Sequence, residues 1–222
     1  AAQSRPRLRR EAAPLRATPF GVEMVSAEGI VTSVPYPGDP GTAIVGVRNA
    51  AATDVQSTAS PYEFLTLEGV GLGLPDADPP QFDRFGNLPR SHEGVRVTLN
   101  GVASPLLSVS ANAVTLIAPE SLGALADGQS VELALERDGQ VVARYPLFAN
   151  GANPRFFTNG EVGARRFAAA VNQDGSVNSR ETPAKPGESL SLYLNGEGAP
   201  LSPVPAGTLL TAAGEWSRLT PK

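Results

Sequence analysis

Apolar and polar residues alternate with a period of two along most of the chain, and the alternating stretches end at Gly, Pro, Asn or Asp. This pattern is typical of half-buried β-strands that are separated by tight turns. A helical spacing of apolar positions is nearly absent, and only residues 120–126 have the pattern of a helical turn. The sequence therefore predicts an all-β protein.

The predicted strands are concentrated between residues 44 and 157, where short alternating stretches follow one another closely. They cover residues 43–47, 62–67, 95–99, 106–109, 113–117, 130–136 and 141–148. Asn100-Gly101 and Asp138-Gly139 are the strongest hairpin signals, because both central residues of the favoured two-residue turn need positive φ. About seven short strands in roughly a hundred residues are typical of an immunoglobulin-like β-sandwich. We expect its core to contain Val95, Val97, Leu99, Leu133, Leu135, Val142 and Tyr145.

A short repeat relates this region to the C-terminal part of the chain. Leu65-Thr-Leu-Glu-Gly-Val-Gly71 matches Leu192-Tyr-Leu-Asn-Gly-Glu-Gly198 at an offset of 127 residues, and each copy follows a turn that contains proline. Residues 158–222 would then form a partial second module with strands at 166–171, 189–194 and 208–212. Three strands leave an apolar face and open edges. Chance similarity between glycine-rich strands is the alternative.

Three segments of the C-terminal part, residues 167–178, 183–194 and 196–198, resemble the uncharacterised C-terminal domain of secreted acidobacterial (Solibacter-type) proteins. Residues 95–107 and 153–158 are similar to the first module of that family, which resembles the IPT/TIG class of immunoglobulin-like folds. The resemblance covers roughly residues 44–207, and the sequence departs from the family pattern after Gly207 and in the N-terminal arm. It implies an exported or surface-attached β-sandwich protein without known catalytic residues.

Cysteine is absent and histidine occurs once, so several common kinds of enzyme site lack their residues. The chain has 222 residues and no cysteine, which excludes disulfides, thiolate zinc sites and cysteine nucleophiles. His92 is the only histidine, so a typical zinc centre lacks ligands. A Ser-His-Asp triad would have to use His92, but no Gly-x-Ser-x-Gly motif is present. We therefore expect no enzyme activity, no catalytic residue and no cofactor.

Two groups of oxygen-bearing side chains resemble parts of calcium sites. The first is Asn172, Asp174, Ser176 and Asn178 at alternate positions, and the second is Asp76, Asp78 and Asp83 in the proline-rich loop of residues 75–92. In the first group Gly175 is at the wrong position for a calcium loop, and no bidentate glutamate follows. A tight Asp-Gly turn and a solvated loop explain the same residues, so we expect no metal site.

Charge is unevenly distributed along the chain. The formal net charge is −4, but residues 1–16 contain five arginines and one glutamate, which leaves −8 on the remainder. A basic arm on an acidic body can act as an electrostatic docking tail, and a solvated terminus is the alternative. We expect no nucleic-acid binding, because the body is acidic and no aromatic residues are interleaved with the arginines.

The apolar runs are too short to span a bilayer, so we expect a protein that does not cross the membrane. Ala1-Ala2-Gln3 is typical of the sequence that remains when a signal peptide is removed at a small-residue site. We therefore expect an exported protein that is extracellular or attached to the cell surface.

The favoured interpretation is a structural assembly protein whose copies join by β-strand complementation. Residues 1–43 would be an N-terminal arm that carries the donor segment 20–34, residues 44–157 the sandwich, and residues 158–222 the acceptor. A head-to-tail contact of this kind builds a filament or surface layer unless it closes into a ring. The expected interface residues are Phe20, Val22, Met24, Val25, Ile30, Val31, Leu192, Leu194, Leu209 and Trp216.

The alternative interpretation is an immunoglobulin-like adhesion or binding module. It would belong to a larger surface protein complex or bind carbohydrate, and the loop of residues 75–92 would be its contact surface.

Overall fold

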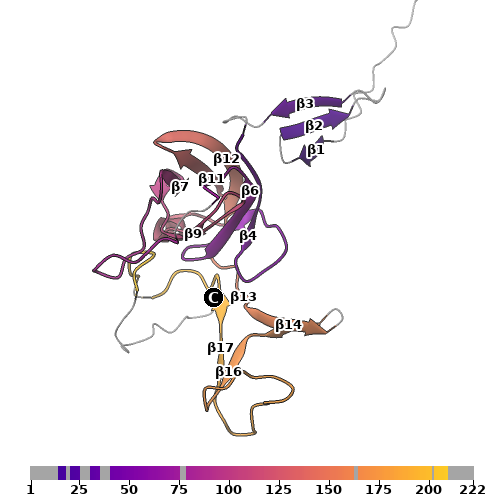
Figure 1. Ribbon diagram of the computed structural model, residues 1–222, viewed down its shortest axis with the longest axis vertical. Coiled ribbons are helices and arrows are strands. Elements are labelled where there is room, and N and C mark those ends of the chain that lie inside the picture. Colours follow the sequence, from indigo (N-terminus) through magenta and orange to yellow (C-terminus); the bar gives the residue numbers. More distant parts are fainter. Residues whose placement is uncertain are drawn as a thin grey trace, which may run out of the picture. The chain divides into compact units, whose positions relative to one another are not determined.

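The computed structural model describes residues 15–18, 21–25, 31–35, 41–75, 79–162, 165–201 and 203–209 (Figure 1). The chain divides into two compact units, Ala1–Tyr36 and Pro37–Lys222. Both units are built from β-strands, and the predicted helical turn is a 3-10 helix over Glu120–Ala124. The prediction of an all-β protein is confirmed.

The larger unit contains a sandwich of two sheets. The first has the order β4-β6-β10-β9, with strands Ala43–Asn49, Phe64–Val70, Ala113–Ile117 and Leu106–Val109. The second has the order β5-β12-β11-β7-β8, with strands Thr58–Ala59, Gln140–Ala149, Ser130–Arg137, Val95–Leu99 and Val102–Ala103. The seven longer strands can be lettered A to G in chain order, as β4, β6, β7, β9, β10, β11 and β12. The first sheet then has the order A-B-E-D, and the second has the order G-F-C with the short strands β5 and β8 at its edges. This is the immunoglobulin arrangement, as the strand pattern predicted.

The inner faces of the two sheets meet in one apolar core. Leu65 and Leu67 of the first sheet and Val97, Leu133 and Leu135 of the second are fully buried in the same cluster. Burial of each such side chain contributes roughly 1.5–3 kcal/mol. Of the other predicted core residues, Val95, Leu99 and Val142 are buried, and Tyr145 packs against the cluster half-buried.

Both predicted hairpin turns have the expected backbone. The φ angles are 49° at Asn100 and 77° at Gly101, and 49° at Asp138 and 79° at Gly139. Positive φ at both central residues defines a type I′ turn, whose twist matches that of the strands it joins. The turns connect β7 to β8 and β11 to β12.

The C-terminal part of the larger unit contains six short strands. They are β13 (Arg155–Phe156), β14 (Thr158–Val162), β15 (Arg165–Ala168), β16 (Ala170–Asn172), β17 (Leu190–Leu192) and β18 (Leu194–Asn195). They pair as β13-β18, β14-β15 and β16-β17. The predicted strand 189–194 is divided at Tyr193, because β17 pairs with β16 and β18 with β13. The predicted strand 208–212 is a single bridge between Thr208 and Asn87 in the described residues.

The smaller unit contains an antiparallel sheet of β1 (Leu15–Thr18), β2 (Gly21–Val25) and β3 (Val31–Pro35). The sequence predicted an N-terminal arm over residues 1–43 with a donor segment at residues 20–34. The structure adds β1, which pairs with β2 in the register Leu15 to Met24. The proposed donor segment is therefore part of a three-stranded sheet.

Candidate functional site

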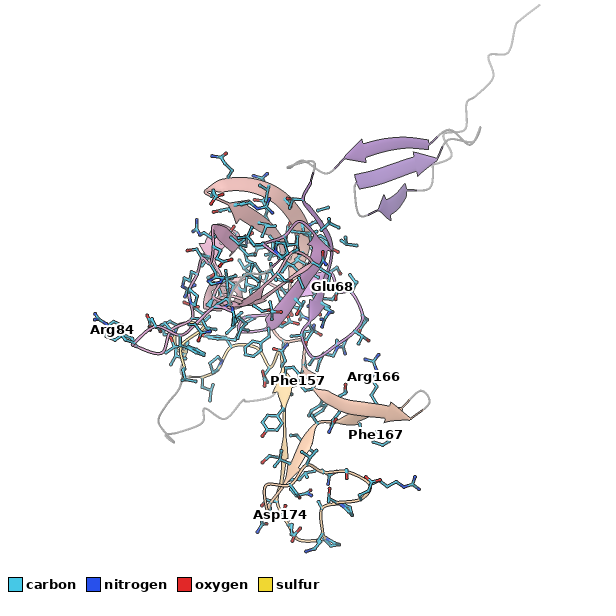
Figure 2. The ribbon with its side chains drawn as sticks, viewed as in Figure 1. Glu68, Arg84, Phe157, Arg166, Phe167 and Asp174 are labelled. Carbon is cyan, nitrogen blue, oxygen red and sulfur yellow. The ribbon has the colours of Figure 1, made fainter. Side chains whose placement is uncertain are left out.

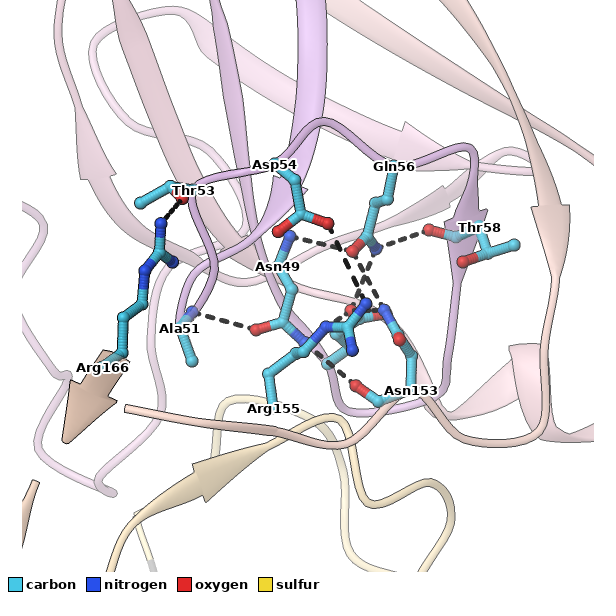
Figure 3. A network of polar contacts seen from close by, with 10 residues as sticks. Asn49, Ala51, Thr53, Asp54, Gln56, Thr58, Asn153, Arg155 and Arg166 are labelled. Carbon is cyan, nitrogen blue, oxygen red and sulfur yellow. Dashed lines mark hydrogen bonds and ion pairs between the residues drawn. The ribbon is translucent and has the colours of Figure 1, made fainter. Parts of the chain in front are cut away.

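A buried carboxylate lies at the start of β6. Glu63 is fully buried, and its Oε1 accepts hydrogen bonds from Asn49 Nδ2 at 2.9 Å, Gln56 Nε2 at 3.0 Å and Asn153 Nδ2 at 2.9 Å. Its Oε2 accepts from the backbone N–H of Ser60 at 2.8 Å. Burial raises the pKa of Glu63, and these hydrogen bonds partly oppose the increase. Figure 3 shows Asn49, Gln56 and Asn153 close together and joined by hydrogen bonds.

Asn195 extends this network into the C-terminal part of the unit. Its Nδ2 donates to Asn49 Oδ1 at 2.7 Å and to the carbonyl oxygen of Phe64 at 2.9 Å, while its Oδ1 accepts from the Phe64 N–H at 2.8 Å. The Asn153 N–H also donates to the Gly196 carbonyl at 2.7 Å. We call Asn49, Glu63, Asn153 and Asn195 the polar joint. Asn49, Glu63 and Asn195 are buried, Asn153 is half-buried, and all four are hydrogen-bonded, so the joint fixes β18 against the sandwich.

Two weaker contacts support the joint from the surface. Arg166 of β15 donates to Thr53 Oγ1 at 2.5 Å, and Arg155 Nη2 lies 3.9 Å from Asp54 Oδ2. Figure 3 shows both arginines directed at the loop that follows β4. Exposed pairs of this kind contribute little stability, so the buried amides carry the attachment.

The same turn precedes β6 and β17. In Ser60-Pro61-Tyr62-Glu63 and in Lys185-Pro186-Gly187-Glu188, the glutamate N–H donates to the first residue's carbonyl, at 3.3 and 3.1 Å. The glutamate Oε2 accepts from the first residue's N–H, at 2.8 and 3.1 Å. The third residue has positive φ in both turns, 62° at Tyr62 and 90° at Gly187, as a type II turn requires.

The strands that follow these turns also correspond. Leu65 pairs with Asn49 in the first copy, and Leu190 pairs with Asn172 in the second. Asn172 is buried like Asn49, and its side chain donates to Ser176 Oγ at 3.0 Å and to the Thr182 carbonyl at 2.8 Å. These matches place the turn and strand of the repeat at an offset of 125 residues. The offset of 127 from the sequence is wrong by two, because alternating leucines and glycines fit at either value.

The two copies differ in burial. Leu65 and Leu67 are 0% exposed under the second sheet of the sandwich, whereas their counterparts Leu190 and Leu192 are 44% and 45% exposed. We call these two side chains the Leu190–Leu192 face. Within the described residues, β17 pairs only with β16, so its other edge is open. Phe156, Phe167 and Tyr193, from the strands nearby, are also about half exposed. Figure 2 shows Phe167 and Arg166 leaving β15 on opposite sides.

The expected interface residues lie in different strands, and some of them lie outside the described residues. Val22, Met24 and Val25 lie in β2 and Val31 in β3, while Phe20, Ile30 and Trp216 lie outside the described residues. Leu192 is exposed in β17, and Leu194 is half-buried in β18. Leu209 is exposed, and its N–H donates to the Gly86 carbonyl at 2.7 Å. Sequence reasoning missed Leu190 and the polar joint. The repeated Pro-x-Glu turn is the signal that could have found Leu190.

The oxygen-rich segments organise turns. Asp174 accepts from the Ser176 N–H at 2.9 Å and from Ser176 Oγ at 2.6 Å, and these bonds lower the pKa of Asp174. Asp83 accepts from the N–H groups of Phe85 and Asn87, at 2.8 and 2.9 Å. Asp76 and Asp78 lie outside the described residues. The described part of the chain contains no group of three His, Cys, Asp or Glu residues placed to hold a metal ion.

His92 lies in a short antiparallel bridge. Its N–H donates to the Val95 carbonyl and its carbonyl accepts from the Val95 N–H, both at 2.9 Å. None of the helices in the described residues has the length and apolar character that crossing a membrane requires.

The strand order and the site define the class of the protein, an immunoglobulin-like β-sandwich that is followed by further short strands. Comparison of the chain with known protein families, characterised proteins and solved structures finds no match.

Proposed function

We propose that the protein is a non-catalytic structural protein of the cell exterior, whose copies assemble by completing the open β-structure of residues 158–222. The observation that carries this proposal is the difference in burial between Leu65–Leu67 and Leu190–Leu192, which occupy equivalent positions after equivalent turns. In the sandwich a facing sheet covers these positions. An equivalent layer over the second copy would come from another chain.

Physical chemistry favours a partner for this region. Apolar surface gains about 25 cal/mol per Å² when it leaves water, so an exposed pair of leucines on a sheet is a binding surface. An open strand edge presents unpaired N–H and C=O groups, which accept a further strand. The polar joint holds β18, which follows β17 after Tyr193, and this attachment favours a preorganised surface on β17.

The cellular location rests on the resemblance of residues 44–207 to the secreted acidobacterial family. An exported sandwich that assembles head to tail would serve as a filament, a surface layer or an adhesion element. Each of these is a homo-oligomer in which the sandwich is the repeating unit.

The first test measures the mass of the purified chain by light scattering coupled to size exclusion, at increasing concentration. We expect species well above the 23.0 kDa monomer. Leu192→Arg places a charge on the Leu190–Leu192 face and should leave only monomer. Leu74→Arg is the matched control, because Leu74 is a leucine with 53% exposure outside the proposed surface, and it should assemble normally. A wild-type chain that remains monomeric at its highest soluble concentration contradicts the proposal.

A second candidate function is partner binding through the proline-rich loop, and the loop tip favours it. Phe82 and Phe85 are 47% and 70% exposed, and the Arg84 guanidinium carbon lies 4.6 Å from the centre of the Phe85 ring. Asp83 fixes the tip through its bonds to Phe85 and Asn87. Figure 2 shows Arg84 at the outer end of the loop. Exposed aromatic residues beside arginine are typical of binding hot spots.

This candidate is tested with immobilised polysaccharides and a double Arg84→Ala, Phe85→Ala variant. Sugar binding that the variant loses, while its assembly stays unchanged, would support the module interpretation. Asp127→Ala is a control in a different exposed loop and should bind as the wild type does. Failure of the wild-type chain to bind any polysaccharide contradicts the carbohydrate version of this function.

A further inference from the structure

The last described segment of the chain, residues 203–209, pairs with the proline-rich loop, and we call this segment the strap. The paired residues are Gly86 with Leu209, Asn87 with Thr208, and Leu88 with Gly207. The Leu88 N–H donates to the Gly207 carbonyl at 2.9 Å, and the Leu209 N–H donates to the Gly86 carbonyl at 2.7 Å. The strap is therefore a short antiparallel addition to this loop.

The strap is also attached to the sandwich. The Tyr62 hydroxyl donates to the Val204 carbonyl at 2.9 Å. Ala206 is 5% exposed and belongs to a small apolar cluster with Leu88 of the loop and Ile117 of β10. The strap therefore joins the loop to the sandwich.

The tip of the loop has hydrogen bonds of its own, but these bonds stay within the loop. Asp83 accepts from the N–H groups of Phe85 and Asn87, which give the tip its bend. In the described part of the chain, both backbone hydrogen bonds that residues 86–88 make outside the loop are bonds to the strap. The strap therefore supports the tip from outside.

Gly207 allows the strap to lie close to its neighbours. Its φ is 84°, and the Thr208 N–H donates to the Pro205 carbonyl at 3.3 Å, as in a type II turn. A Cβ atom at Gly207 would lie 2.5 Å from Pro105 Cβ, which is closer than two carbon atoms can approach. A side chain at this position would therefore push the strap away from the loop.

We propose that the strap is a latch for the loop tip. While the strap is bound, Phe82 and Phe85 are held as a fixed contact surface, and its release loosens the tip and weakens the binding of a partner. This inference rests on the second candidate function, partner binding through the loop, and adds a control to that site. Contact residues that are ordered before binding bind more tightly, because the cost of ordering them is already met.

Release of the strap requires less free energy than unfolding of the sandwich. The pairing covers three residues of the loop, and the buried residue of the strap, Ala206, lies in a cluster apart from the main core. Segments with few buried contacts open locally while the core stays folded.

Amide hydrogen exchange, followed residue by residue by NMR, tests the latch without any ligand. Gly207→Ala should release the strap, and exchange should become several times faster at Leu88, Phe85 and Asn87. Gly128→Ala is the matched control, because Gly128 also has a positive φ, 81°, but an added Cβ there meets nothing within 4 Å. It should leave the exchange of the loop as it is in the wild type.

A milder variant covers the case in which Gly207→Ala does not fold. Thr208→Val removes the hydroxyl that donates to Asn87 Oδ1 at 2.9 Å and adds no atom at Gly207. It should accelerate exchange at the same loop residues by a smaller factor. Slow exchange of the β11 amides shows that the sandwich remains folded in each variant.

The outcomes separate the latch from the second candidate function. Faster exchange at Leu88 alone, with Phe85 and Asn87 as in the wild type, overturns the latch, because the tip is then ordered without the strap. Equal binding of a polysaccharide by the wild type and by a Gly207→Ala variant with fast exchange also overturns it. A wild type that binds no polysaccharide contradicts the carbohydrate version of the second function, and the exchange result alone then decides the latch.

Discussion

Glu63 is the residue on which the attachment of the C-terminal part depends. Three side-chain amides and one backbone N–H donate to its carboxylate, and two of these donors, Asn49 and Asn153, belong to the polar joint. Without the carboxylate, the Ser60 N–H would lose this acceptor, and each of the three amides would keep only its second acceptor, the Asn153 carbonyl, the Thr58 carbonyl or Gln56 Oε1. A buried donor left unsatisfied costs about 1–3 kcal/mol. The joint therefore stabilises the fold only as long as its central acceptor is present.

We expect Glu63→Ala to lower the free energy of unfolding by about 3 kcal/mol, measured by chemical denaturation. The pKa of Glu63 is raised above its ordinary value of 4.5 by burial. Its favourable contribution is therefore complete below that value and is lost as the pH rises through the folded-state pKa. Glu63→Gln removes this titration, so the wild type should lose stability relative to Glu63→Gln as the pH rises from 4.5 through the raised folded-state pKa of Glu63.

Glu68→Gln is the control for this experiment, because Glu68 forms an ion pair with Arg48 at 2.7 Å on the surface. It should change the free energy of unfolding by less than about 1 kcal/mol. Equal effects of Glu63→Ala and Glu68→Gln would show that the joint does not stabilise the fold.

At the scale of elements, the sandwich was predictable because its strands are buried on one face. The alternation that buries Val97, Leu133 and Leu135 is the same alternation that is visible in the sequence. The turn residues were equally informative, since Asn-Gly and Asp-Gly tolerate the positive φ that their turns require. β1 was missed because Leu15–Thr18 follows an arginine- and proline-rich stretch that has the composition of a solvated terminus.

The candidate site was only partly predictable. Leu192 was expected to be exposed at an interface, but Leu190 was not, because the repeat was aligned two residues too late. The polar joint unites residues 49, 63, 153 and 195, and single Asn and Glu residues at strand ends form no periodic pattern. Their meeting depends on long-range pairing, which the local sequence does not encode.

At the scale of the whole molecule, the proposed assembly would combine two forces with different ranges. Apolar packing over the Leu190–Leu192 face would act at contact and depend little on salt, whereas the charges of residues 1–16 and of the remaining chain act over the Debye length. That length is about 10 Å at 0.1 M salt and about 3 Å at 1 M. Salt should therefore slow the association of copies more than it weakens the contact once formed.

We expect the initial rate of assembly, followed by light scattering, to fall when NaCl is raised from about 0.05 M to about 0.5 M. The final mass should change much less, because in the proposed assembly the buried leucines would hold the copies together. Substituting serine for Arg5, Arg7, Arg9 and Arg10 should slow assembly at low salt and remove most of the salt dependence. A matched variant with lysine at the same four positions keeps the charge and should behave like the wild type. If the serine variant keeps the full salt dependence, the arm does not guide assembly, and the attraction must arise from charges elsewhere on the chain.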